Sequence, residues 1–392
     1  MKRLNEEVEG TRVETDLLGA VEVPAGALYG AQTQRALENF PLGMGKTIGS
    51  FPTLIEGLML IKQAAARVNG ANGFISAEQA DAIIQAAREV RERKEAFFDQ
   101  FPIHYLHGGG GTSANMNANE VLANLAEEIL GGRRGQYRLV HPNDHVNRHQ
   151  STNDVYPTAC HIAIILKWPS LRSALTRLNE TLNEKAVAFQ EHVRIARTCL
   201  QDAVAITFKD LLGGYGCFLE RACRHLGRAV AELYAVNLGG TIVGRHCDVP
   251  AAYLEQIAPA LAEAAGDPSY RRAENLFDAA QNPDPIVQVS AQLDILARGL
   301  IKIAKDFRLM ASGPEAGLGE IRIPAVQPGS SIMPGKVNPV IPEFLIQAGF
   351  QAMGAHHACQ AALDHGELDL NVWESTLVFN VLEAMDLLAA AI

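Results

Sequence analysis

The chain has 392 residues, a formal net charge of −10, 48% hydrophobic residues and only 6% aromatic residues. This length is sufficient for a large core, and the negative charge disfavours a nucleic-acid-binding surface. Among the six cysteines there is no CxxC pair, so we expect no zinc or redox motif, no metal and no cofactor. No secretory signal and no run of about 18 apolar residues is visible, and we therefore expect a cytoplasmic protein that does not span a membrane.

The first 100 residues contain several helix signals. Residues 19–24 predict a turn and a short extended piece, and residues 31–40 predict a helix. Apolar residues from Leu54 to Val68 follow the spacing of one helix face. The next helix begins at Ser76, because Gln79 three residues later completes a capping box.

Polar clusters and glycine-rich loops interrupt this helical pattern. The glycine-dense loop 107–111 is followed by the polar segment 112–120, and helical sequence returns at 121–129. A second loop at 141–145 leads to the polar cluster 150–154. Taken singly, each such cluster is typical of a helix cap or a turn.

Long helices dominate the sequence after residue 155. Leucines from Leu171 to Leu182 mark one helix, and apolar residues from Leu293 to Met310 recur at a 3-4-3-4-3 spacing that is typical of a bundle seam. Strand-like alternation is scarce, so the sequence predicts an all-α fold. We expect a helical N-terminal domain at 1–148 and a long-helix bundle at 149–392, whose last helical pattern has no stop signal.

The segment 327–339 differs from its helical surroundings. Two glycines and three prolines in thirteen residues exclude a regular helix or strand. A glycine-punctuated loop presents backbone N–H groups and allows a ligand to approach closely. With an ammonium group at Lys336 and a carboxamide at Asn338, the loop suits a small carboxylate. The alternative is a polar connection between two helices.

Four segments together resemble one enzyme family. Residues 111–120, 143–147 and 151–154 resemble regions shared by aspartases and class II fumarases, and residues 329–338 resemble the signature of the aspartase/fumarase superfamily. The resemblance runs from about residue 11 to the end of the chain. It implies a lyase acting on a small dicarboxylate, and a homotetramer with a central bundle in which three subunits build each active site. It also implies that the small C-terminal domain of the family is missing.

The resemblance implies roles for residues of the signature loop 327–339. Ser330 matches the serine that acts as the general base. Ser331 matches a neighbour that helps to hold the substrate, and Lys336 and Asn338 match residues that bind a substrate carboxylate.

Further positions of the family pattern lie elsewhere in the chain. Glu343 matches the acidic residue that pairs with a catalytic histidine in fumarases, and Cys199 occupies the position of that histidine. Five residues match substrate-binding positions: Thr112, Ser151, Thr152, Asn153 and Thr198. Three residues match a second, non-catalytic dicarboxylate site: His141, Asn143 and Asp144.

These residue types suit the chemistry of such a lyase. Removing a proton from the carbon beside a carboxylate places a second negative charge on that carboxylate, which becomes an aci-carboxylate. Several donors aimed at the carboxylate must stabilise this charge, and hydroxyls such as Thr112 and Ser151 can supply them. A serine hydroxyl acts as a base only when its oxyanion is stabilised, for which loop N–H groups and Lys336 are available.

The leaving group is the open question. Four details favour an aspartate ammonia-lyase, namely residues 112–115, His145 after Asp144, residues 151–153 and residues 338–343, whereas residues 30–35 favour a class II fumarase. Cys199 forms weaker hydrogen bonds than histidine, which disfavours fumarase chemistry more than ammonia loss. A lyase acting on another substituted succinate and a non-catalytic helical scaffold remain alternatives. The intact set of site residues argues against the scaffold: Thr112, Ser151, Asn153, Ser330, Lys336 and Asn338.

Overall fold

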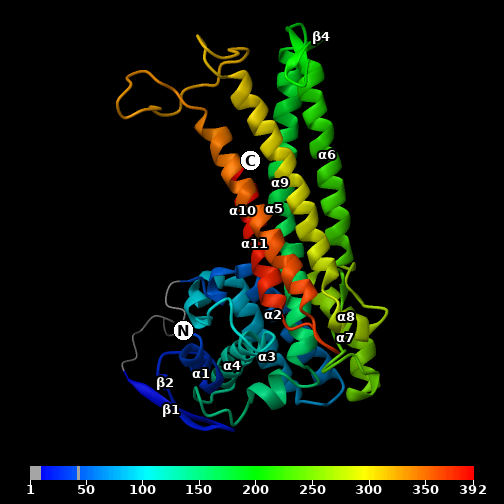
Figure 1. Cartoon of the computed structure of the whole chain (residues 1–392). Helices are drawn as coiled ribbons and strands as arrows, with labels where there is room; N and C mark the ends of the chain where they lie inside the picture. Colours follow the sequence, from blue (N-terminus) through cyan, green and yellow to red (C-terminus); the bar gives the residue numbers. More distant parts are fainter. Residues whose placement is uncertain (1–9, 42–44) are drawn as a thin grey trace. The chain divides into compact units, whose positions relative to one another are not determined.

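The computed structural model describes residues 10–41 and 45–392, and helices account for most of them (Figure 1). Within these ranges the strands form three sheets of two strands each. The predicted α-helical fold class is therefore confirmed, with small sheets as an addition. None of the helices in the described ranges has both the length and the apolar character that crossing a bilayer requires.

The described residues form two compact units. The first unit comprises the described residues of Met1–Leu166 together with Glu232–Ile286 and Ala361–Phe379. The second comprises Lys167–Ala231, Val287–Gln360 and Asn380–Ile392. Both units are discontinuous in sequence, and the domain boundary at residue 148 stays a prediction.

The first unit contains two small sheets and a group of short and medium helices. Strands β1 (Thr11–Asp16) and β2 (Gly19–Pro24) form an antiparallel hairpin, and β5 (Ala235–Val236) pairs in parallel with β6 (Arg271–Arg272). Helices of this unit are α1 (Ala31–Asn39), α2 (Pro52–Ala71), α3 (Ala77–Glu92), α4 (Thr112–Ile129), α7 (Ala251–Ala265) and α8 (Leu276–Gln281). Short helical turns cover Ile48–Ser50, Lys94–Gln100, Pro142–Val146 and His246–Asp248.

Local sequence signals explain the helices that the sequence predicted here. The capping box of Ser76 and Gln79 is present at the start of α3. The predicted apolar face of α2, which includes Leu54, Leu58 and Ile61, is fully buried. Helix α2 packs on α3 and α7, and α3 packs on α4. These contacts fix α4, whose first turn carries Thr112.

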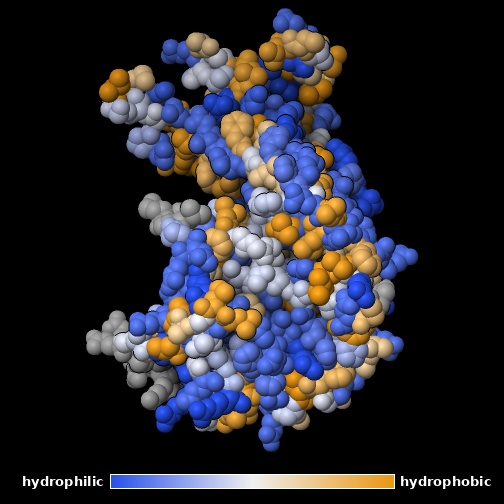
Figure 2. Space-filling view, turned by 60° about the horizontal axis from the view of Figure 1, so that its bottom comes forward, coloured by the Kyte–Doolittle hydropathy of each residue, from blue (hydrophilic) through white to orange (hydrophobic). Residues whose placement is uncertain are grey.

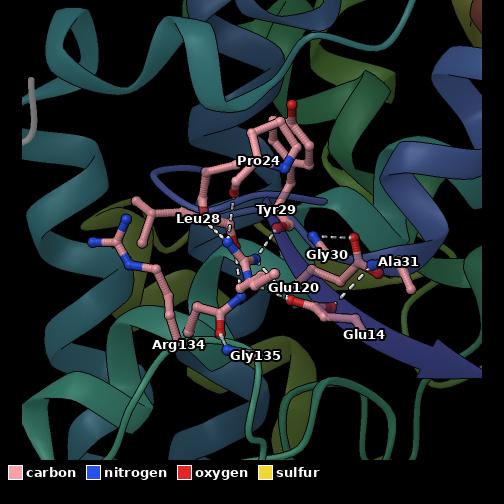
Figure 3. A network of polar contacts seen from close by, with 12 residues as sticks. Glu14, Pro24, Leu28, Tyr29, Gly30, Ala31, Glu120, Arg134 and Gly135 are labelled. Carbon is pink, nitrogen blue, oxygen red and sulfur yellow. Dashed lines mark hydrogen bonds and ion pairs between the residues drawn. The ribbon is translucent and has the colours of Figure 1, made fainter. Parts of the chain in front are cut away.

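A buried carboxylate on α4 anchors the N-terminus of α1 (Figure 3). Glu120 accepts hydrogen bonds from the backbone N–H groups of Gly30 at 2.9 Å and Thr33 at 3.1 Å, and from the Thr33 hydroxyl at 2.6 Å. Glu14 on β1 accepts a further bond from the Ala31 N–H at 3.0 Å. Burial raises the pKa of Glu120 to about 7, while these donors oppose the shift. The network joins β1, α1 and α4 into one piece.

Long helices form the second unit. Helix α6 (Phe208–Glu232) follows the hairpin of β3 (Val193–Thr198) and β4 (Gln201–Thr207). Helix α6 has its last residue, Glu232, in the first unit, and four other helices are also divided between the units: α5 (Thr152–Ala188), α9 (Asp284–Met310), α10 (Val340–Asp364) and α11 (Glu374–Ala391).

The seam predicted on α9 is largely buried. Leu293, Leu296, Leu300 and Met310 have at most 4% of their surface exposed. Helices α6 and α9 lie close together, because a Cβ atom at Gly299 would collide with the ring of Phe218. The helices also share a polar contact, in which the Tyr215 hydroxyl donates to Asp306 Oδ2 at 2.6 Å. The 3-4 spacing therefore marks helix–helix packing, as the sequence predicted.

Candidate active site

The predicted substrate-binding residue Thr112 is the first residue of α4. The three preceding glycines have left-handed φ angles of 84°, 58° and 85°. At Gly111 a side chain is also excluded by space, because a Cβ would collide with the buried ring of Tyr156. Thr112 is exposed at this helix N-terminus, where backbone N–H groups attract anions. The helix begins at Thr112 and includes the polar segment 112–120, which the sequence had set apart from the helix at 121–129.

The second polar cluster caps helix α5. Ser151 Oγ accepts a hydrogen bond from the N–H of Asn153 at 3.2 Å, and Asp154 Oδ1 accepts one from the N–H of Ser151 at 3.0 Å. The Asn153 side chain donates to the carbonyl of Ile242 at 2.9 Å. The serine and the aspartate thus satisfy backbone donors reciprocally at the helix start.

One side chain joins the starts of these two helices. Asn115 Nδ2 donates to Thr152 Oγ1 at 3.1 Å and lies 3.2 Å from Asn147 Oδ1. Because Thr152 accepts this bond, its own hydroxyl proton remains available for an acceptor such as a carboxylate oxygen. The structure therefore brings the first turn of α4 and the first turn of α5 to one place.

Buried charges hold the segment that leads into α5. Lys62 Nζ donates to Asn147 Oδ1 and to Gln150 Oε1, both at 2.9 Å. Asp154 Oδ2 accepts from the N–H of Gly239 at 3.0 Å. Burial lowers the pKa of Lys62 to about 7 and raises the pKa of Asp154 to about 6, and their mutual attraction opposes both shifts. Lys62 thus holds Asn147 and Gln150 against α2, and Asp154 holds the start of α5 against the loop that contains Gly239.

The signature loop is closed on itself at its base. The N–H of Gly329 donates to the carbonyl of Lys336 at 2.8 Å, and Asn338 Nδ2 donates to the carbonyl of Gly329 at 2.8 Å. At the far end, the N–H of Lys336 approaches the carbonyl of Met333 at 3.3 Å across a turn in which Gly335 has a φ of 81°. Proline followed by a left-handed glycine is typical of a type II turn. Asn338 therefore shapes the loop in addition to its predicted substrate role.

Ser330 Oγ is the acceptor of two backbone donors. The N–H groups of Ile332 and Met333 point to it at 3.2 Å and 3.0 Å. Ser330 is half-buried, whereas Ser331 and Lys336 are exposed. Donors in this arrangement stabilise negative charge on the oxygen.

The predicted site residues Thr198 and Cys199 belong to a hairpin that the sequence did not predict. Cys199 and Leu200 form the turn between β3 and β4, with φ angles of 51° and 63°. Cys199 is exposed. Arg194 and Arg197 of β3 form ion pairs with Glu320 at 2.9 Å and 2.5 Å. These pairs tie the hairpin to the segment that precedes the signature loop.

The remaining predicted residues have well-defined partners. Glu343, in the first turn of α10, pairs with Arg308 at 3.2 Å. His141 Nδ1 accepts from the N–H groups of Asn143 at 3.2 Å and Asp144 at 3.3 Å, which caps the turn Pro142–Val146. Asn143 and Asp144 are exposed and lie on the same turn as His141, and their role in a second dicarboxylate site stays a prediction.

The predicted residues divide between the two units. In the first unit the structure brings together the starts of α4 and α5, and the three second-site residues share one turn. In the second unit it brings together the signature-loop residues and, separately, the hairpin residues. The first group comprises Thr112, Ser151, Thr152, Asn153, His141, Asn143 and Asp144, and the second comprises Thr198, Cys199, Ser330, Ser331, Lys336, Asn338 and Glu343.

Known enzymes of two types are similar in sequence to nearly the whole of this chain. A fumarate hydratase class II from Thermosynechococcus vestitus is 44% identical over 387 residues, which cover 97% of this chain and 80% of the relative. An aspartate ammonia-lyase from Bacillus subtilis is 43% identical over 377 residues, covering 96% and 78%. A family profile described as "Lyase" matches residues 19–354. This chain belongs to the aspartase/fumarase superfamily.

Solved structures of the superfamily have the same fold. A fumarate lyase:delta crystallin from Brucella melitensis in its native form has a TM-score of 0.91 at 42% identity, covering 97% of this chain and 86% of that chain. A class II fumarase from Schistosoma mansoni has a TM-score of 0.92 at 36% identity, covering 97% and 82%. The chain is thus a superfamily lyase by sequence and by fold, and the similar identities to both enzyme types leave its substrate open.

Several residues that shape the candidate site were not identified from the sequence. Asn115 was part of a recognised polar cluster, but its bond to Thr152 depends on the packing of two helices. Lys62 lies within the apolar run 54–68, where a single charged residue on a buried face is a signal for an internal polar contact. Asp154 was placed beside the site, and its buried contacts with Gly239 come from a loop 85 residues away.

Proposed function

We propose that this protein eliminates ammonia from L-aspartate to give fumarate, with Ser330 as the general base. The Ser330 oxyanion takes the C3 proton, and the electron pair of that C–H bond forms the double bond through an aci-carboxylate intermediate. The C2–N bond then breaks, and ammonia leaves with its electron pair. Water lost from L-malate by the same route is the alternative.

The observation that carries the proposal is the environment of Ser330 Oγ. Two backbone N–H groups, from Ile332 and Met333, donate to it within 3.2 Å. A serine hydroxyl is a weak base unless its ionised form is stabilised, and fixed backbone dipoles provide such stabilisation without reorganisation. The closed base of the loop, between Gly329 and Lys336, keeps these donors in place.

The substrate carboxylates require donors at two positions. For one carboxylate the start of α4 and the start of α5 offer backbone N–H groups and the hydroxyls of Thr112, Ser151 and Thr152. For the other, Lys336 is exposed on the signature loop and provides a cation. A protein with a net charge of −10 must concentrate its cations locally to hold a dianion.

Ammonia is favoured over water by the residues around position 199. Cys199 replaces the histidine that the fumarase mechanism uses, and the acidic residue that pairs with this histidine, Glu343, is paired with Arg308 here. A proton relay for water chemistry is therefore incomplete. The amino group of the substrate carries a proton at neutral pH and leaves as neutral ammonia. Its loss therefore does not depend on that relay.

We also propose that the protein works as a homotetramer whose copies contribute different loops to each active site. Helices α9 and α10 leave large apolar side chains exposed, among them Ile295 at 49%, Phe344 at 47% and Phe350 at 56%. Figure 2 shows that apolar side chains reach the surface in several patches on the face drawn there. Exposed apolar patches of this kind mark contacts with other chains.

A direct assay tests the reaction. Ultraviolet absorbance should show fumarate formed from L-aspartate, and slower or no formation from L-malate and argininosuccinate. Faster turnover of L-malate would replace the proposal with the fumarase alternative. Turnover of none of the three would point to another substituted succinate or to a non-catalytic scaffold.

A further inference from the structure

The first unit contains a cavity whose lining differs from the predicted site. Its volume is about 370 Å³, within the usual range for small-molecule sites. Its walls come from α5, α8, the first residues of α9 and the first residue of α11. None of the predicted catalytic or substrate-binding residues lines it.

A buried carboxylate with one unpartnered oxygen lies in the wall of this cavity. Glu374 is only 4% exposed, and its Oε2 has no hydrogen-bond partner among the described residues. Rotation about the last side-chain bond, which is soft, can turn either oxygen toward the cavity. Burying a carboxylate without a partner costs free energy. A ligand that donates a hydrogen bond to Glu374 would therefore be stabilised in this cavity.

A second unpartnered acceptor lies in the same wall. Asn237 is 3% exposed, and its Nδ2 donates to the carbonyl of Asn153 at 3.0 Å, which fixes the orientation of the amide. Its Oδ1 is buried and has no partner in the described part of the chain. Two buried acceptors in the cavity wall, Glu374 Oε2 and Asn237 Oδ1, therefore have no hydrogen-bond donor among the described residues.

The charge of the cavity lining is entirely negative. Glu232, Glu274, Asp278 and Asp284 line the cavity, and the lining contains no lysine or arginine. Burial raises the pKa of Glu374 to about 8, so this carboxyl group releases its proton to solvent when a cation binds beside it. His161 also lines it and adds no positive charge at neutral pH, because burial lowers its pKa to about 4. Carboxylates and amide oxygens without cations attract a positively charged donor.

We propose that this cavity binds a small organic ammonium compound, whose charged amine donates to Glu374 and to Asn237 Oδ1. An ammonium group has three protons to donate and no acceptor, which complements a wall of acceptors. A volume of about 370 Å³ exceeds the needs of one metal ion, and the described residues contain no cluster of three or more His, Cys, Asp or Glu that could hold one. The carboxylates of the rim, such as Asp278 and Asp284, suit a second amine on the same molecule.

Isothermal titration calorimetry on the full chain tests this proposal, with 1,4-diaminobutane as the probe. The neutral 1,4-butanediol, of similar length, tests the need for charge. Glu374→Gln keeps the shape and removes the charge, and Asp284→Asn does the same at the rim. Glu78→Gln, on the first turn of α3 and outside the cavity, is the matched control.

We expect saturable binding of the diamine and none of the diol. Glu374→Gln should weaken diamine binding by about tenfold or more, the scale of one charged hydrogen bond. Asp284→Asn should weaken it less, and Glu78→Gln should leave it unchanged. Circular dichroism will show whether each variant is folded.

Three results would overturn the proposal. The first is no saturable binding of the diamine to the wild-type protein at millimolar concentration. The second is equal affinity in folded Glu374→Gln and wild-type protein. The third is displacement of the diamine by an equimolar amount of MgCl₂, which would show an inorganic cation site.

Discussion

Asn115 on α4 and Thr152 on α5 share a hydrogen bond of 3.1 Å that holds the first turns of the two helices together. We expect Asn115→Ala to lower kcat/KM for the proposed reaction by about tenfold or more, because the Thr152 hydroxyl loses its positioning donor. The folded protein should lose about 1–3 kcal/mol of stability. Steady-state kinetics and thermal unfolding measure both effects.

Asn117 provides the matched control for Asn115. It is equally buried on the same helix, and its Nδ2 donates to the carbonyl of Gln100 at 2.9 Å, away from Thr152. Asn117→Ala should cost similar stability and leave kcat/KM close to wild type. Equal activity losses in both variants would mean that the Asn115 effect is only structural.

Replacing Ser330 with alanine removes the proposed base. We expect turnover to fall by about three orders of magnitude or more, since the base and its positioning are lost together. The melting temperature should change little, because Ser330 lies in a loop that is mostly exposed. Ser331→Ala, one residue further, should act mainly on KM. Retention of more than about a tenth of the wild-type turnover in Ser330→Ala would exclude Ser330 as the base.

Substitutions at Cys199 distinguish ammonia loss from water loss. If residue 199 only lines the amino-group pocket, Cys199→Gln should keep aspartate turnover within about tenfold, or roughly 1.4 kcal/mol in the barrier. Cys199→His should not create malate dehydration. Both variants are assayed on both substrates. Loss of aspartate turnover in Cys199→Gln together with a gain on malate in Cys199→His would favour the fumarase alternative.

The buried Glu374 should make stability depend on pH. Burial raises its pKa to about 8 in the folded state, above the usual value of about 4.3 in an unfolded chain. Between these values the unfolded chain releases the proton while the folded chain keeps it, so stability falls as the pH rises. Glu374→Gln should therefore raise the melting temperature most above pH 8 and little at pH 5.

The groups that face Glu374 do not reverse this expectation. Tyr156 and Cys160 on α5 are both buried, and burial raises the pKa of each above its ordinary value, so both are neutral in this range. Glu78→Gln again serves as the exposed control and should show no such pH profile. A constant difference in melting temperature between pH 5 and pH 9 would contradict the assignment to Glu374.

Assembly can be tested separately from activity. Exposed apolar side chains on α9 and α10, such as Ile295 and Phe350, should be covered by other copies of the chain. Sedimentation at micromolar concentration should show a tetramer. A stable monomer would count against both the tetramer and active sites shared between copies.

Local signals made much of the fold predictable. The capping box at Ser76 depends only on Gln79 three residues later, and the seam of α9 depends only on apolar spacing. The hairpin of β3 and β4 was not predicted, because its turn residues Cys199 and Leu200 are not those that such a turn prefers. Its alternation, with Val193 and Ile195 facing polar neighbours, is short and was the one available signal.

The candidate site was predictable as far as its motifs are continuous in sequence. The loop around Ser330 is continuous, so its residues could be named together. The hydrogen bond between Asn237 and Asn153 joins positions 84 residues apart. The unpartnered oxygen of Glu374 depends on how α11 packs. Such contacts are created by tertiary packing and have no local signature.

The left-handed turn at Cys199 has a consequence for how the substrate preference of this fold can change. The backbone there is unfavourable for nearly every side chain, and only asparagine, aspartate, histidine and glycine tolerate it well. The turn therefore gives no strong stability preference between cysteine and glutamine, and it favours histidine over both. Under the proposed role of position 199, a substitution at this exposed tip would alter the chemistry offered to a substrate without disturbing a packed core. New specificities could then arise here by single mutations that leave the scaffold intact.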